Sequence, residues 1–195
     1  MERKSVIRVF ISMLVITCFL CACNNTGDKS DETPDEIVES IYGVEEKEEI
    51  LKILNAYPAS VNPNEAAANG LFVITFEGVN ADSKIVWDTF YEEVQQGKDT
   101  SIIIVEYTVE GDAILTYISF KEGSFYSLVD VSRDKFGVGE AYYDGSYHFL
   151  KMYDYDAGSG VLVLLTNFDC ASYEDFDEET LEDIAAVKHL FFMEN

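Results

Sequence analysis

The feature that most constrains the fold is a series of apolar segments separated by short turns in the middle of the chain. Residues 102–109, 113–120 and 125–131 are such segments, with only residues 110–112 and 121–124 between them. They are rich in β-branched and aromatic residues, which is typical of strands. Strands joined by such short links pair with their neighbours in the sequence, so the pattern predicts an antiparallel meander.

Further strands are predicted on both sides of this meander. Residues 71–76 form an apolar strand before it, and residues 147–153 and 161–166 are expected to pair across a glycine-rich turn. The dipeptide Asp144-Gly145 is a strong hairpin signal, and it predicts a turn in front of the first of these two strands. The expected sheet has about five to six antiparallel strands.

Three segments have the spacing of helices. Residues 34–55 begin with a proline after a threonine cap, residues 84–96 end before Gly97, and residues 178–192 close the chain. The apolar stripe of the second helix consists of Ile85, Val86, Phe90 and Val94, with Trp87 and Tyr91 beside it. The prediction is an α+β class in which two or three helices pack on one face of the antiparallel sheet.

The N-terminus has the pattern of an export signal. Residues 1–22 begin with the cations Arg3, Lys4 and Arg8 and continue with the apolar run 9–20. A basic start before an apolar run of about 7–15 residues is typical of a secretory signal peptide. The run is too short for a comfortable membrane-spanning helix, which needs about 20 residues.

The signal ends in a sequence that resembles a bacterial lipobox, Leu20-Cys21-Ala22-Cys23. The resemblance implies a diacylglycerol on the thiol of Cys23 and cleavage before it, with Cys18 as the rival position. The chain left after cleavage would keep only Cys23 and Cys170, so neither a cysteine metal cluster nor a disulfide is predicted. Residues 23–33 are then a lipidated flexible tether, and residues 34–195 a single α+β domain.

The chain is strongly acidic, with a net charge of −24. Residues 1–22 carry three cations and one anion, so their removal makes the net charge −26. Nucleic acid is excluded as a partner, because its binding requires lysines and arginines that neutralise phosphates. Two interpretations of the acidity stay open: a solvated surface, or attraction for divalent cations or for a cationic protein, peptide or wall component.

No catalytic residue, cofactor or metal ligand is predicted. His148 lies in a predicted strand and His189 in the last predicted helix, and no nucleophile motif accompanies either. Cys170 follows an aspartate, which favours a partly buried, unreactive thiol. Residues 154–160 begin like the calcium-binding loop of an EF-hand. The residues that such a loop requires at its fifth, sixth and twelfth positions are missing, so a hairpin turn is the better interpretation.

Residues 73–137 combine a strand, a helix ending in Gly-Lys, the sequence YTVEGD at 107–112 and the sequence DKFG at 134–137. This stretch resembles the small Gram-positive lipoproteins that carry domain of unknown function 4362. The resemblance implies an exported lipoprotein with this order of elements, and it implies no activity.

The sequence therefore predicts a lipoprotein held at the outer face of the bacterial cytoplasmic membrane through Cys23. Its expected role is a binding or accessory function and not an enzymatic one. A divalent-cation-binding protein and a cell-wall-directed hydrolase are the alternatives.

Overall fold

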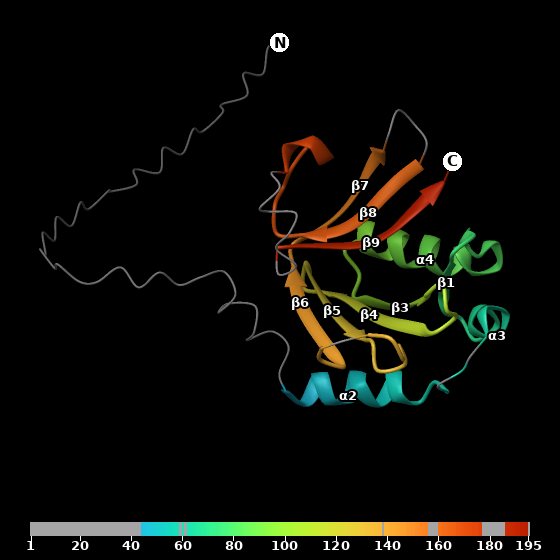
Figure 1. Ribbon diagram of the computed structural model, residues 1–195. Coiled ribbons are helices and arrows are strands. Elements are labelled where there is room, and N and C mark those ends of the chain that lie inside the picture. The colour runs from blue at the N-terminus through green and yellow to red at the C-terminus, as the bar shows by residue number, and fades with distance from the viewer. Residues whose placement is uncertain are drawn as a thin grey trace, which may run out of the picture. The chain divides into compact units, whose positions relative to one another are not determined.

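The computed structural model of the chain describes residues 44–58, 60, 62–137, 139–155, 160–176 and 186–194. All of them belong to one compact unit. The elements of these residues, labelled in Figure 1 where there is room, are α2 (Val44–Asn55), α3 (Pro63–Ala68), β1 (Phe72–Thr75), β2 (Gly78–Val79), η1 (Ala81–Ser83), α4 (Lys84–Gln95), β3 (Thr100–Tyr107), β4 (Ala113–Lys121), β5 (Ser124–Asp130), β6 (Tyr142–Tyr147), β7 (Phe149–Tyr155), β8 (Gly160–Thr166), η3 (Tyr173–Asp175) and β9 (Val187–Glu194).

The larger sheet has six strands in the order β2-β1-β3-β4-β5-β6. Strands β3 to β6 form an antiparallel meander, in which β3, β4 and β5 confirm the prediction and β6 was not predicted. Strand β1, however, is parallel to β3, with Phe72 opposite Ile104, so the sheet is mixed and not wholly antiparallel. The physical reason is the connection: helix α4 lies between these two strands, and parallel neighbours need such a long crossover.

A second sheet has the order β7-β8-β9. Its β7–β8 pair was predicted and is confirmed, with Phe149 opposite Thr166. Strand β9 corrects the prediction of a final helix over residues 178–192, of which residues 178–185 lie outside the described ones. Residues 187–194 are extended because they pair with β8, which is apolar on both faces.

Both faces of the six-stranded sheet are covered, because neighbouring residues of its strands point to opposite sides and both sides are apolar (Figure 1). Phe72 belongs to the cluster shared with α4 and the three-stranded sheet, which also contains Trp87, Phe90, Ile104, Leu165 and Phe191. Val73 belongs to the cluster on the other face, which also contains Ile50 and Leu54 of α2 and Ala66 of α3. The prediction that the helices share one face is therefore wrong.

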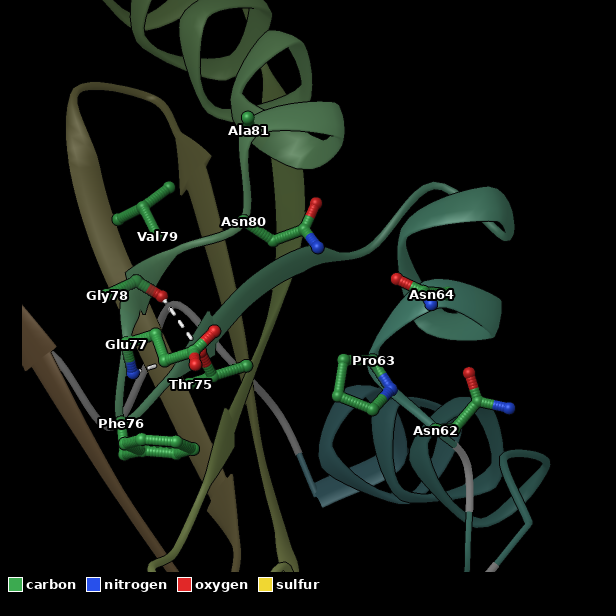
Figure 2. A pocket seen from close by; sticks show the side chains of 10 residues that line it. All are labelled: Asn62, Pro63, Asn64, Thr75, Phe76, Glu77, Gly78, Val79, Asn80 and Ala81. Atoms are coloured by element: carbon green, nitrogen blue, oxygen red, sulfur yellow. Dashed lines mark hydrogen bonds between the residues drawn. The ribbon is translucent and has the colours of Figure 1, made fainter.

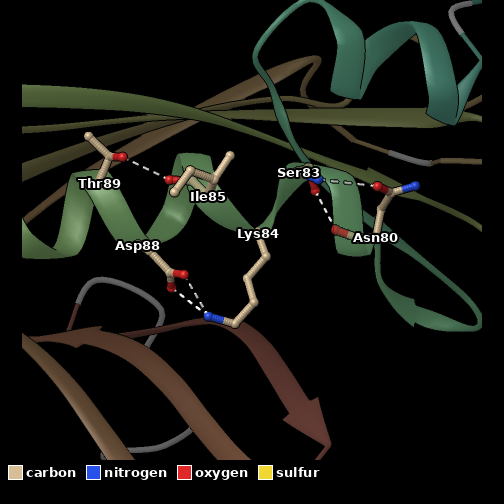
Figure 3. Close-up of polar contacts among 6 residues, drawn as sticks. All are labelled: Asn80, Ser83, Lys84, Ile85, Asp88 and Thr89. Carbon is tan, nitrogen blue, oxygen red and sulfur yellow. Dashed lines mark hydrogen bonds and ion pairs between the residues drawn. The ribbon is translucent and has the colours of Figure 1, made fainter.

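Helix α4 forms where the sequence predicted it, and it follows directly on the 3-10 helix η1, whose cap Asn80 is visible in Figure 3. The side chain of Asn80 accepts a hydrogen bond from the backbone of Ser83 at 3.3 Å, and the hydroxyl of Ser83 donates back to Asn80 O at 2.9 Å. The predicted stripe needs correction: Ile85 is 66% exposed, whereas Trp87 is buried. The helix therefore packs on the sheet through a face centred on Trp87 and Phe90.

The dipeptide Asp144-Gly145 does not form the predicted turn but lies inside β6. Asp144 accepts a hydrogen bond from the hydroxyl of Tyr126 on the neighbouring strand and pairs with Lys47 of α2. Gly145 is needed for close approach: a Cβ there would stand 2.7 Å from the hydroxyl oxygen of Tyr147. Cross-strand contacts and a side chain lying over the glycine thus override the local turn signal.

The N-terminal helix is described only from Val44, so the predicted residues 34–43 lie outside the described ones. Its C-terminal end is held by Arg133, which donates to Leu54 O at 2.8 Å and to Tyr57 O at 3.0 Å. Arg133 also pairs with the fully buried Asp130 at the end of β5. This arginine therefore ties α2 to the meander.

Candidate functional site

A cleft lies where β1 and β3 end side by side (Figure 2). It consists of two adjoining hollows of about 710 and 450 Å³ that share four lining residues, Asn62, Pro63, Thr75 and Phe76. The first hollow continues along residues 77–81, and the second along residues 107–111. We call these two hollows together the sheet-end cleft.

The turn between β1 and β2 forms one wall and carries Phe76 and Glu77. The hydroxyl of Thr75 donates to Gly78 O at 3.3 Å and accepts from the backbone of Glu77 at 3.2 Å, so the turn is closed on itself. Gly78 has a φ of +105°, a conformation that glycine adopts without strain. The closed turn leaves the ring of Phe76 81% exposed at its tip.

The turn between β3 and β4 forms the second wall. The backbone of Thr108 donates to Asp112 O at 2.9 Å, and Gly111 N donates to Thr108 O at 2.9 Å. Between these bonds the chain presents Val109, which is 85% exposed, and the exposed Glu110. Two apolar side chains on neighbouring turns thus point away from the core at the same end of the sheet.

A salt bridge fixes the base of this second turn. The carboxylate of Asp112 pairs with the ammonium of Lys135 and also accepts from Lys135 N at 3.1 Å. These hydrogen bonds hold the pKa of Asp112 below its usual value. The turn that carries Val109 is therefore tied to the loop after β5.

The opposite side of the first hollow is polar and is formed by the start of α3. The side chain of Asn62 caps this helix by accepting from Glu65 N at 2.9 Å, and Pro63 opens its first turn. Helix α3 was not predicted, because Pro58 and Pro63 were interpreted as the two ends of a loop.

The electrostatics of the cleft follow from its lining. Among the described lining residues, Glu77 and Glu110 are the charged side chains, and both are acidic. Exposed apolar groups next to carboxylates suit a ligand that combines an apolar group with positive charge.

The residues that the sequence singled out lie elsewhere. His148 stands between β6 and β7, beside the ring of Phe149, and not inside a strand as predicted. His189 lies in β9 and not in a helix, with its ring 6.1 Å from that of Tyr173.

Cys170 is a free, half-buried thiol, which confirms the predicted partial burial, and the hydroxyl of Tyr153 donates to its backbone oxygen at 2.9 Å. The lipidation candidate Cys23 lies outside the described residues, and so does most of the stretch 154–160 that begins like a calcium loop. Among the described residues, no group of three or more histidine, cysteine or acidic side chains is placed to hold a metal ion. Nor is any described helix both long enough and apolar enough to cross a bilayer.

Comparison with known families places the two turns of the cleft, but not its α3 side, in a recognised sequence unit. The family described as Domain of unknown function (DUF4362) matches residues 72–159. This DUF4362 match covers less than half of the chain. The match contains the whole stretch 73–137 on which the resemblance was noted, and it includes both turns of the sheet-end cleft. Helices α2 and α3 and strands β8 and β9 of this fold lie beyond the DUF4362 match. No curated protein and no solved structure matches the chain.

Proposed function

We propose that this protein is a lipid-anchored, extracytoplasmic binding module that captures a cationic peptide segment in its sheet-end cleft. The observation that carries the proposal is the pair Phe76 and Val109, 81% and 85% exposed on adjacent turns and flanked by Glu77 and Glu110. Burying one such side chain contributes about 1.5–3 kcal/mol, so the pair offers an anchor for an apolar residue of the partner.

The positive charge of the partner follows from the charge of the domain. With a net charge of −24, the chain attracts cations over the Debye length of about 8 Å at physiological salt. The two glutamates of the cleft place negative charge next to its exposed apolar side chains. A basic segment with an aromatic or aliphatic residue between its cations, in a protein, a peptide or a wall-linked peptide, matches both features.

The location follows from the N-terminal sequence. The resemblance of residues 20–23 to a lipobox supports two acyl chains on a glyceryl group at Cys23, and two chains give stable anchoring where one does not. Residues 24–33 then act as a tether of roughly 15–20 Å. An anionic bilayer surface repels the acidic domain, so the anchor holds the domain near the outer face of the Gram-positive cytoplasmic membrane without drawing it onto the lipid.

The binding claim is tested by fluorescence anisotropy with the full-length protein in detergent. The probe is a labelled heptapeptide in which lysines alternate with phenylalanine and leucine. Phe76→Ser and Val109→Ser should each weaken its binding about ten-fold, since about 1.4 kcal/mol corresponds to a factor of ten. Ile85→Ser is the matched control, because Ile85 is exposed on α4 outside the cleft lining.

Two further peptides separate the contributions to binding. A peptide with glutamates in place of the lysines should not bind, and a lysine–glycine peptide should bind weakly and lose its affinity in high salt. Equal binding of the acidic peptide, or an equal loss of affinity in Ile85→Ser, would overturn the cleft proposal.

Anchoring has its own test. Cells that express the full chain and are fed an alkyne analogue of palmitate should label the protein, and Cys23→Ala should abolish the label and release the protein or leave its signal uncleaved. Cys18→Ala is the control and should label normally. Unchanged processing and labelling of Cys23→Ala would refute the anchor without affecting the cleft.

A further inference from the structure

A second, smaller cleft of about 130 Å³ lies between β9 and the six-stranded sheet. Its polar lining includes Glu106 of β3, Thr116 of β4, Tyr143 of β6 and Lys188 of β9, and its floor is apolar. Pockets for drug-sized ligands measure about 300–1,000 Å³, so this one suits only a small solute. It shares no lining residue with the sheet-end cleft.

Lys188 faces this cleft from β9, two residues before an irregularity in the strand. Lys188 pairs with Leu165 and His189 with Leu164, but Phe191 pairs with Val163, so one extra residue is inserted. Such bulges re-aim side chains and are over-represented next to functional sites. Because Lys188 stands opposite Leu165, its side chain lies on the face of β8 that carries Leu165, toward the six-stranded sheet, while the ring of His189 contacts Tyr173 on the other face.

Lys188 and Glu106 carry opposite charges and face the same cleft, but they do not form a salt bridge with each other. Six other pairs of basic and acidic side chains in the described residues form salt bridges, but these two make none, and neither has a side-chain hydrogen bond. The ammonium of Lys188 lies 5.5 Å from the centre of the Tyr143 ring. Within the part of the chain that the structure describes, both charges are thus left without a direct ionic partner.

The titration behaviour of the two groups agrees with this geometry. Desolvation lowers the pKa of Lys188 to about 8 and raises that of the Glu106 carboxyl, and in each case the charge of the other group opposes the shift. Desolvation and Glu106 also raise the pKa of Tyr143, and desolvation lowers that of His189. A ligand that brings a compensating charge to each group stabilises both ionised forms.

We propose that this cleft binds a small zwitterionic α-amino acid, with its carboxylate on Lys188, its ammonium on Glu106 and its side chain over the apolar floor. A simple anion would be attracted by Lys188 but repelled by Glu106. A simple amine would be attracted by Glu106 but repelled by Lys188. Only a molecule that carries both charges a few bonds apart satisfies both residues. The volume limits the ligand to the size of glycine, alanine or serine.

The test is thermal unfolding of the full-length protein in detergent at pH 7 with glycine, L-alanine or D-alanine, followed by calorimetric titration. A saturable rise in Tm is expected with one or more of them and not with acetate, methylammonium or leucine. Lys188→Met and Glu106→Gln should each weaken binding at least ten-fold. Lys84→Met removes an equal charge from the exposed surface of α4 and should leave binding unchanged.

Several results would overturn the proposal. One is the absence of any saturable shift beyond that caused by sucrose at equal osmolality. Another is equal binding of acetate, which would indicate an anion site, and a third is unchanged amino-acid binding in Lys188→Met. Phe76→Ser, which disables the sheet-end cleft, should not affect amino-acid binding, so the two proposals fail independently.

Discussion

Replacing Lys188 by methionine should make the protein more stable at neutral pH. Burial lowers the pKa of this lysine from 10.5 to about 8, so the folded state binds its proton less tightly than the unfolded state does. At about 1.36 kcal/mol per pKa unit, the charged lysine costs about 3 kcal/mol at pH 7, an upper bound because the residue keeps some exposure. Lys188→Met removes this cost and retains the length of the side chain.

The sign of the pH dependence distinguishes this effect from simple hydrophobicity. Between pH 8 and 10.5 the unfolded chain holds more protons on Lys188 than the folded chain, so this residue makes stability rise with pH in that range. The advantage of Lys188→Met over the wild type should therefore shrink by about half, to about 1.5 kcal/mol, at pH 9.5.

Urea denaturation at pH 7 and pH 9.5 measures both quantities. Lys84→Met serves as the control: its ammonium is exposed and paired with Asp88 one helical turn away, so we expect a change below about 0.5 kcal/mol at both pH values (Figure 3). Equal stability of Lys188→Met and the wild type, or a difference that does not change with pH, would refute the desolvation of Lys188.

Four further predictions concern other parts of the fold. Arg133→Met should lower the free energy of unfolding by about 3–5 kcal/mol in urea titrations, because it leaves the buried carboxylate of Asp130 without its partner, and a loss below 1 kcal/mol would contradict this. Gly160→Ala should destabilise by about 1–3 kcal/mol, since its Cβ would stand 2.3 Å from a backbone oxygen of β9, whereas a neutral change would show that β8 and β9 are spaced more widely. Hydrogen bonds from Lys135 lower the pKa of Asp112, so this aspartate stabilises the fold above its unfolded pKa and loses that effect as the pH falls through the lower folded pKa. Asp112→Asn should therefore make Tm depend less on pH in the acid range, and an unchanged dependence would contradict this prediction. Calcium and sodium at matched ionic strength should raise the Tm equally if the acidic surface is only screened, and a saturable shift with calcium alone would favour the cation-binding alternative.

The meander could be predicted from the sequence because its signals are local. Strands β3, β4 and β5 are apolar segments separated by two short turns, so their pairing follows from chain order. The parallel pairing of β1 with β3 depends on how α4 packs across the sheet, which no short window of sequence contains.

Two errors show tertiary contacts overriding local signals. Asp144-Gly145 has the composition of a turn, but its aspartate bonds to Tyr126 and its glycine lies under Tyr147, so the dipeptide stays in a strand. Residues 187–194 have apolar spacing that fits a helix, but pairing with β8 makes them extended. Both outcomes depend on residues that are distant in the sequence or on the opposite face of a sheet.

The sheet-end cleft was missed because its signal is weak. Phe76 and Val109 each stand next to an acidic residue followed by glycine, and in both places the apolar residue was counted as the end of a strand. A large apolar side chain placed directly before a Glu-Gly turn could have been recognised as exposed. The cleft of Lys188 left no such signal, because the sequence placed its lysine on a helix.

The most direct test of the binding claim is site-specific photocrosslinking on the full-length protein. Benzoylphenylalanine placed at position 76 or 109 should crosslink the labelled lysine–phenylalanine–leucine peptide on irradiation, and excess unlabelled peptide should suppress the product. The same photoreactive residue at position 85, which is exposed on α4, should give none. Crosslinking of equal yield from position 85, or none from positions 76 and 109, would contradict the account.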